Sequence, residues 1–204
     1  MPEYGRGRQP GQRNMYVVGA YKEELLKELR NNPDFQLALL GNELKPELTP
    51  KQIKQSFKEC VFDHAFVPGT NVEEKIFVCM EIVCPYADAI TWKDLYIYIY
   101  VFTPKMAVQW DEEQDSEIKV SSTLEQRGYI GNKIDMVVDI IDRRINGFEN
   151  LSLGKIKLAP RDGMQIFSYV DGYYGKQLIY TATDFNLLPS SAISDMYTNG
   201  ELNG

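Results

Sequence analysis

The segment over residues 94–102, with the sequence DLYIYIYVF, constrains the fold of this chain more than any other. Aliphatic residues alternate there with aromatic ones, and this period of two predicts a β-strand. The aliphatic face consists of Leu95, Ile97, Ile99 and Val101. The aromatic face consists of Tyr96, Tyr98, Tyr100 and Phe102. Because neither face is polar enough to stand freely in water, we expect a strand that is covered on both sides.

The tyrosine face of this segment has two structural explanations. It is either a second layer of core or a subunit interface, where tyrosine is enriched because it buries area and keeps a polar tip. A third possibility is stacking on the bases of a single nucleic-acid strand, which the mixed charges nearby, including Asp94, disfavour. We therefore treat Tyr96, Tyr98 and Tyr100 as candidate oligomer-interface residues.

Further strands are predicted on both sides of this segment. Residues 75–84 (KIFVCMEIVC) follow a Gly-Thr-Asn turn and end before Pro85. They are close enough in sequence to form a hairpin with residues 94–102. Three shorter candidates, residues 152–158, 164–169 and 177–184, follow in the last third of the chain.

Helices are predicted by hydrophobic residues at helical spacing and by start signals. In residues 16–30 the apolar positions are Val18, Tyr21, Leu25 and Leu29. Asn32-Pro33 and Thr49-Pro50 each combine a capping residue with proline at the first helical position, which predicts two further helices. Gly41 is a plausible stop for the first of these two.

A last helix is predicted over residues 131–145, and Asn146-Gly147 is expected to end it. Its apolar stripe consists of Ile134, Val138, Ile141 and Ile145. A separate acidic stripe consists of Asp135, Asp139 and Asp142. Such a stripe is a solvated helix face, a surface that repels DNA phosphates, or a site for a hard cation.

The order of these elements predicts an α+β fold, with helices packed on one face of a mainly antiparallel sheet, because strands and helices do not alternate regularly. The polar, acidic residues 105–125 are expected to form a long exposed connection. A single core domain is expected over residues 15–186. A flexible basic arm over residues 1–14 precedes it and a polar extension over residues 187–204 follows it.

Composition narrows the class of protein. With 44% hydrophobic residues, the chain is an ordinary globular sequence, and its net charge of −7 disfavours broad attraction to nucleic acid. Three scattered cysteines do not form a disulfide framework. The start of the chain lacks the apolar segment of a secretory signal, and the longest apolar stretch is too short to span a bilayer. We therefore expect synthesis in the cytoplasm and no membrane partner.

The sequence has no recognisable catalytic constellation. Its single histidine, His64, lies beside Asp63 and four residues after Cys60, but nearness in sequence does not establish a nucleophile–base pair. One histidine and three scattered cysteines do not make a zinc pattern, and the glycine-rich phosphate-binding motifs are missing. We expect a non-enzymatic protein without cofactor or metal.

The second half of the chain resembles neck proteins of tailed bacteriophages, especially tail terminators and tail-completion proteins. The likeness consists of an amphipathic helix ending in Asn-Gly at 134–147, a glycine-containing strand at 153–158, the motif YGKQLIY at 174–180 and TDFN at 183–186. In the first half, VFDHAFVPGT before KIFVCMEIVC follows a similar order. The resemblance spans residues 16–186. The arm and the extension have no counterpart, and the acidic connection is longer than the pattern suggests.

The resemblance implies a structural role in the virion. Tail terminators form a hexameric ring that caps the tail tube and meets the connector proteins on the head side, and the genome passes through the lumen. By this likeness the partners are further copies of the chain, tail tube protein and head–tail connector proteins, with DNA passing without sequence-specific binding. The tyrosine strand would supply ring contacts, and Asp135, Asp139 and Asp142 would face the lumen.

Two other classes of function remain open from the sequence. The chain could be a soluble adaptor domain that binds other proteins in the cytoplasm, or a small enzyme with an unfamiliar site. Assembly into a ring or binding to tube protein would indicate a neck protein. Binding to a peptide as a monomer or dimer would indicate an adaptor. A concave pocket with converging titratable groups would indicate an enzyme.

Overall fold

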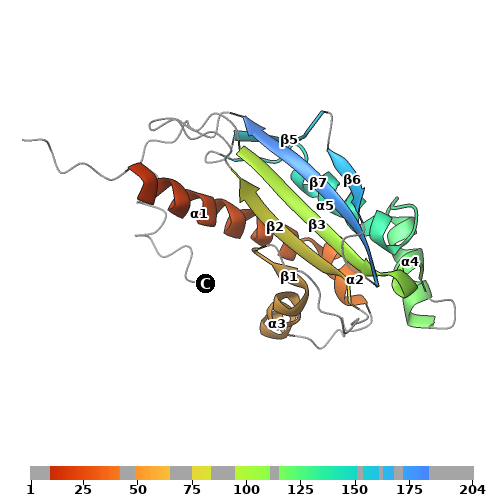
Figure 1. Cartoon of the computed structure of the whole chain (residues 1–204). Coiled ribbons are helices and arrows are strands. Elements are labelled where there is room, and N and C mark those ends of the chain that lie inside the picture. The colour runs from red at the N-terminus through yellow and green to blue at the C-terminus, as the bar shows by residue number, and fades with distance from the viewer. Residues whose placement is uncertain are drawn as a thin grey trace, which may run out of the picture.

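The computed structural model describes residues 10–41, 49–64, 75–83, 95–110, 115–150, 154–160, 163–167 and 172–183. It confirms a single α+β domain with a mostly antiparallel sheet. In the view of Figure 1 the strands face the reader and the helices α1, α2 and α5 lie behind them. One face of the sheet is therefore covered by helices, as the sequence predicts.

The sheet has the strand order β1-β2-β3-β7-β5-β4 among the described residues, and β6 also pairs with β7. The strands are β1 (Val61–Phe62), β2 (Phe77–Val83), β3 (Leu95–Pro104), β4 (Glu149–Asn150), β5 (Gly154–Leu158), β6 (Met164–Phe167) and β7 (Tyr173–Thr183). The predicted hairpin is confirmed, because β2 and β3 are antiparallel neighbours. All ten residues of β3 pair with β7 on its other side. The strand that dominates the sequence therefore lies between two long partners.

The helices are α1 (Pro10–Arg30), α2 (Pro33–Leu40), α3 (Pro50–Cys60), α4 (Asp115–Gln126) and α5 (Lys133–Ile145), with a short 3₁₀ turn η2 (Lys105–Ala107) after β3. Their start signals act as predicted. The side chain of Asn32 accepts hydrogen bonds from the first turn of α2, and Thr49 forms a capping box with Gln52 at the start of α3. Asn132 caps α5 in the same way.

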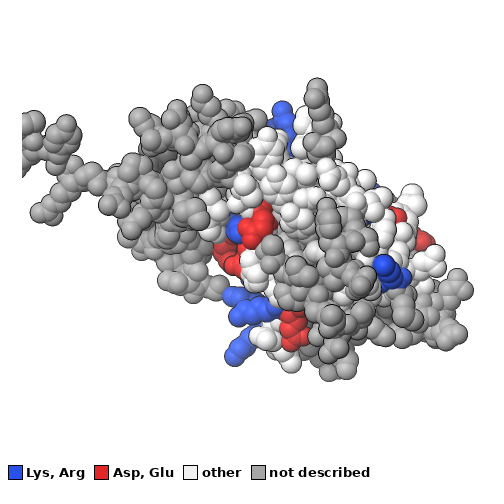
Figure 2. All heavy atoms as spheres, viewed as in Figure 1, with Lys and Arg blue, Asp and Glu red and all other residues white. Residues whose placement is uncertain are grey.

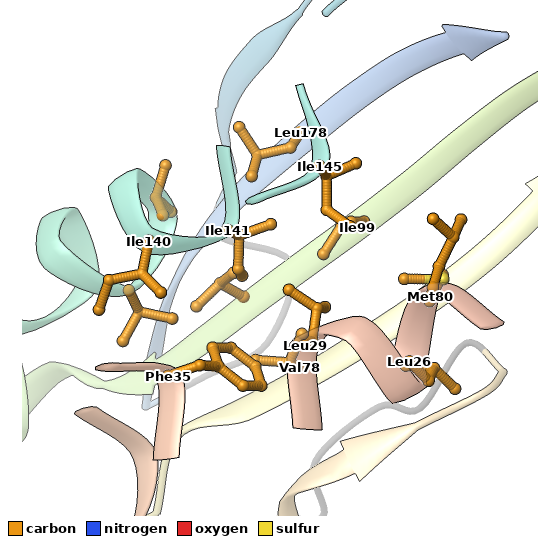
Figure 3. Close-up of a cluster of buried hydrophobic side chains, with 14 of the residues drawn as sticks. Leu26, Leu29, Phe35, Val78, Met80, Ile99, Ile140, Ile141, Ile145 and Leu178 are labelled. Carbon is orange, nitrogen blue, oxygen red and sulfur yellow. The ribbon is translucent and has the colours of Figure 1, made fainter. Parts of the chain in front are cut away.

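The core lies between the helices and the aliphatic face of the sheet. From α1 and α5 it receives Leu25, Leu29, Ile141 and Ile145, all fully buried. From the sheet it receives Val78, Met80, Ile97, Ile99 and Leu178. Figure 3 shows side chains from both layers meeting in this space. The alternation along β3 thus determines which face the helices cover.

Two expectations about connections and helix ends are wrong. The residues over 105–125 are not one long exposed connection, because η2 and α4 occupy most of the described part. Val120 and Leu124, one helical turn apart, are buried in the core, and their small number among polar neighbours hid the helical pattern. The first helix begins at Pro10 rather than near residue 16, so residues 10–14 of the expected arm are helical.

The strands also differ from the prediction in detail. β1 pairs with β2 in parallel, an arrangement that two residues of sequence could not reveal. β5 and β6 both pair with β7, and the break between them lies opposite Ile179, which donates to the Gly163 carbonyl and accepts from the Ala159 amide. The break requires glycine, because a Cβ at Gly163 would lie 2.6 Å from the Ala159 carbonyl oxygen.

Parts of the expected domain limits cannot be compared with the structure. Residues 1–9 of the arm and the whole extension over 187–204 lie outside the described residues. The described elements run from Pro10 to Thr183 and fall within the expected core domain apart from the start of α1. The arm and the extension therefore stay predictions.

Burial of Ile141 should contribute strongly to stability, because its side chain is fully buried in the core. We expect Ile141→Ala to lower the free energy of unfolding by roughly 2–5 kcal/mol and Ile141→Val by about 0.5–1.5 kcal/mol. Urea denaturation followed by circular dichroism measures both. Ser122→Ala on the exposed side of α4 is the control and should stay within about 0.5 kcal/mol of the parent. Equal effects of the two alanine variants would contradict this core.

Candidate subunit interface

The face of the sheet opposite the helices carries a ladder of stacked aromatic rings along β3. The rings of Tyr96, Tyr98, Tyr100 and Phe102 follow one another with centroid separations of 6.4, 6.5 and 6.4 Å and interplanar angles of 27°, 14° and 19°. The three tyrosines are half-buried. Alternate residues on one face of a strand are natural neighbours, so the strand itself sets this spacing. The structure thus brings together all three predicted interface residues.

The strand register extends the aromatic ladder sideways into rows. Tyr98 lies between Glu81 on β2 and Ile179 on β7. Tyr100 lies between Cys79 on β2 and Gln177 on β7. We call the surface made by these rows the open face, because none of the described helices packs on it; it comprises the outward residues of β2, β3 and β7. The sequence predicted its central strand, but the neighbours came from pairing with β7, which is far away in the chain.

One end of the open face is closed into a second small core. Phe77, Cys79, Phe102 and Tyr173 are all buried there, with exposed fractions between 0% and 7%. The rings of Phe77 and Tyr173 lie 6.0 Å apart. Buried Cys79 serves in this cluster as a small apolar residue. The ladder thus runs from a buried end at Phe102 toward half-buried rings at Tyr96.

The rest of the open face is poor in free charge. Glu81 forms a salt bridge of 2.6 Å with Lys22, which reaches it from α1. Val83, at the end of β2 beside Tyr96, exposes 44% of its surface. Figure 2 shows this side of the molecule, where most of the described surface is uncharged. An aromatic surface with a compensated carboxylate is typical of the central part of a protein interface.

The acidic residues of α5 form ion pairs and hydrogen bonds with other side chains, unlike the residues of a freely solvated helix face. Asp135 is ion-paired with Lys176 on β7, and Asp139 with Arg143 one turn further along the helix. Asp142 accepts a hydrogen bond of 3.1 Å from the hydroxyl of Tyr180. Burial, together with the neighbouring Asp142 carboxylate, raises the pKa of Tyr180 far above its ordinary value. Asp135 and Asp142 therefore join α5 to β7.

A second polar network, which sequence reasoning missed, joins the helices to one another. Asp34, in the first turn of α2, accepts a hydrogen bond of 2.8 Å from the hydroxyl of Tyr129 and is ion-paired with Arg127. The guanidinium of Arg143 lies 4.4 Å from the centre of the Tyr129 ring and donates to the Gly128 carbonyl. Asp34 lies far from the other residues in the chain, so no local sequence pattern predicts this network.

The residues considered for catalysis differ in their exposure to solvent. His64 lies on the surface with 61% of its side chain exposed, and its Nδ1 is 2.8 Å from a carboxylate oxygen of Asp63. The hydrogen bond to His64 lowers the pKa of Asp63. Cys60, at the end of α3, is buried with 4% of its surface exposed. His64 and Asp63 form an exposed pair with ordinary structural contacts.

Metal sites need converging ligand side chains, and membrane spans need long apolar helices. Within the described ranges, no group of three or more His, Cys, Asp or Glu side chains is placed to hold a metal ion. None of the helices described there combines the length and apolar character needed to cross a membrane. The three carboxylates of α5 instead interact with protein side chains: Asp135 and Asp139 are ion-paired with Lys176 and Arg143, and Asp142 is hydrogen-bonded to Tyr180.

The family model that matches the chain covers residues 23–182, from within α1 to near the end of β7. The chain belongs to the YomW family. This family is phage-derived, so the chain is a phage-associated protein. No curated protein matches it. The matched range contains the open face, the two polar networks and nearly the whole sheet.

The buried hydrogen bond of Tyr129 should make stability depend on alkaline pH. Burial, with the hydrogen bond to Asp34, raises the pKa of Tyr129 from 10.0 to about 12. Because folding favours the neutral phenol, its contribution is fully present below pH 10 and is lost as the pH rises toward about 12. The difference in unfolding free energy between the parent and Tyr129→Phe should therefore shrink over this window.

Urea denaturation at a series of pH values measures this difference. Tyr98→Phe is the matched control, because it removes a tyrosine hydroxyl from the open face, on the other side of the sheet from the α2 helix that carries Asp34. A difference for Tyr129→Phe that stays constant up to pH 12 would contradict the buried hydrogen bond.

Proposed function

We propose that this YomW-family protein is a non-catalytic structural component of the phage neck, a tail terminator that assembles into a ring on the tail tube. The open face carries this proposal. A ring needs a large adhesive surface on each copy, and the stacked Tyr96, Tyr98 and Tyr100 offer aromatic area with polar tips. The resemblance to neck proteins and the phage-derived family support the same role.

The fold gives the open face the rigidity that an interface requires. Residues of β3 are hydrogen-bonded on both sides, to β2 and to β7, so the tyrosines project from the centre of the sheet. Rings that already stack on one another lose little freedom on binding, and this lowers the entropic cost of association. We therefore propose that the tyrosine ladder contacts a neighbouring copy and that the ring has six members, as in the proteins it resembles.

We further propose that α5 faces the lumen through which DNA passes. The three carboxylates would contribute unequally to repulsion of phosphate. Asp135 and Asp139 are ion-paired with Lys176 and Arg143, which offset their charges. Asp142 accepts a hydrogen bond from the hydroxyl of Tyr180 and forms no ion pair with the described residues, so no neighbouring cation offsets its charge. Tail tube protein and the head-side connector would bind the two ends of the ring, and the protein would reside in the virion neck.

Introducing a charge into the ladder should prevent ring formation. In Tyr98→Asp a carboxylate would be desolvated at the proposed subunit contact, so we expect a hexamer-sized species with a central hole to be replaced by monomer. Light scattering gives the mass, and negative-stain imaging of the same sample shows the ring. Ser122→Asp, on the exposed side of α4, introduces the same charge away from the open face and should leave the ring intact.

Folding of the variant must be verified separately. Tyr98→Thr keeps a strand-forming residue while it removes the aromatic side chain. It should weaken assembly of the subunits with little change in the temperature of thermal unfolding. A folded Tyr98→Asp protein that still forms the ring would exclude the ladder as the subunit contact. If the parent stays monomeric alone and with tail tube protein, the terminator proposal fails and the adaptor function takes its place.

A further inference from the structure

The helix α3 presents a basic face that the ring proposal does not use. Lys51, Lys54 and Lys58 recur at intervals of three and four residues, so they share one side of the helix, and all three are exposed. In Figure 2 a group of basic side chains stands at the lower side of the molecule, where Figure 1 draws α3. The other side of α3 is anchored by Phe57, whose ring stacks 5.8 Å from that of Phe35.

The charge on this face is not compensated within the part of the chain that the structure describes. There, none of the three lysines forms an ion pair or a side-chain hydrogen bond, although the chain has a net charge of −7. The carboxylate nearest in sequence, Glu59, is ion-paired with Lys75 at 3.0 Å. Lysines one helical turn apart repel each other, so Lys54 and Lys58 destabilise the α3 helix unless an anion lies between them.

We propose that α3 binds the phosphate backbone of double-stranded DNA without reading its sequence. Lys51 and Lys58 are separated by about 10 Å along the helix axis, and over that length duplex DNA carries roughly six negative charges. Gln52 and Gln55 are exposed beside the lysines, and their amides can donate hydrogen bonds to phosphate oxygens. The proposal is independent of the ring, because α3 is a different surface from the open face.

The overall negative charge does not prevent such a contact. At physiological ionic strength, charges more than about 8 Å away are largely screened, so the groups on α3 itself dominate the local field. Among the other exposed polar groups of α3, Gln52 and Gln55 are neutral, and the charge of Glu59 is offset by its ion pair with Lys75. A chain with this distribution should bind DNA weakly, with an affinity that falls as the salt concentration rises.

Fluorescence anisotropy of a short labelled duplex of arbitrary sequence tests the proposal with the full chain. The variant Lys51→Gln/Lys54→Gln/Lys58→Gln preserves helix propensity and should bind roughly tenfold more weakly at low salt. The parent should show a slope of about −2.7 in a plot of log affinity against log salt, as expected for three phosphates, and the variant a slope near zero. Lys27→Gln/Lys105→Gln/Lys119→Gln removes the same charge from exposed sites elsewhere and should bind as the parent does.

Several outcomes would overturn the proposal. Equal losses in the two triple variants would show a general effect of net charge, and unchanged binding in the α3 variant would place the contact elsewhere. A parent that ignores the duplex at low salt but binds a polyglutamate peptide would show that α3 recognises an acidic protein. The mass of each sample is measured in parallel by light scattering. A parent protein that binds DNA but forms no ring would count against the ring proposal alone.

Discussion

The antiparallel pairing of β3 with β2 and β7 is the interaction on which the rest of this structure depends. β3 is apolar on both sides, and a strand of this kind is stable in water only when both faces are largely removed from it. Pairing with β7 along its whole length and with β2 on the other side creates a surface wide enough for α1 and α5 to cover. The helices would have no common platform without it.

The two faces of β3 are used differently, and this asymmetry gives the protein its proposed role. Helices bury the aliphatic face completely, with Ile97 and Ile99 at 0% exposure. The tyrosine face keeps its rings partly exposed except at Phe102, where a second cluster closes it. A protein that joins neighbours through one sheet face needs this division, because the covered face provides stability and the open face provides adhesion.

The charged residues also fall into two groups, one with internal contacts and one on the surface. The carboxylates Asp34 and Asp142 accept hydrogen bonds from Tyr129 and Tyr180. These contacts connect the helices to one another and to the sheet. The uncompensated lysines of α3 lie on the surface instead. In a phage-derived protein with a net charge of −7, the distribution of charge is therefore more informative about partners than its sum.

Local sequence determined the elements whose cause is local. The alternation over 94–102, the caps at Asn32 and Thr49 and the apolar stripe of α5 were all readable, because each depends on residues within one or two turns or strands. The tertiary structure alone decided the parallel pairing of β1, the burial that makes α4 a helix, and the partners of Asp135 and Asp142 on β7. These features depend on residues far apart in the chain, and only the folded sheet around β3 brings those residues close together in space.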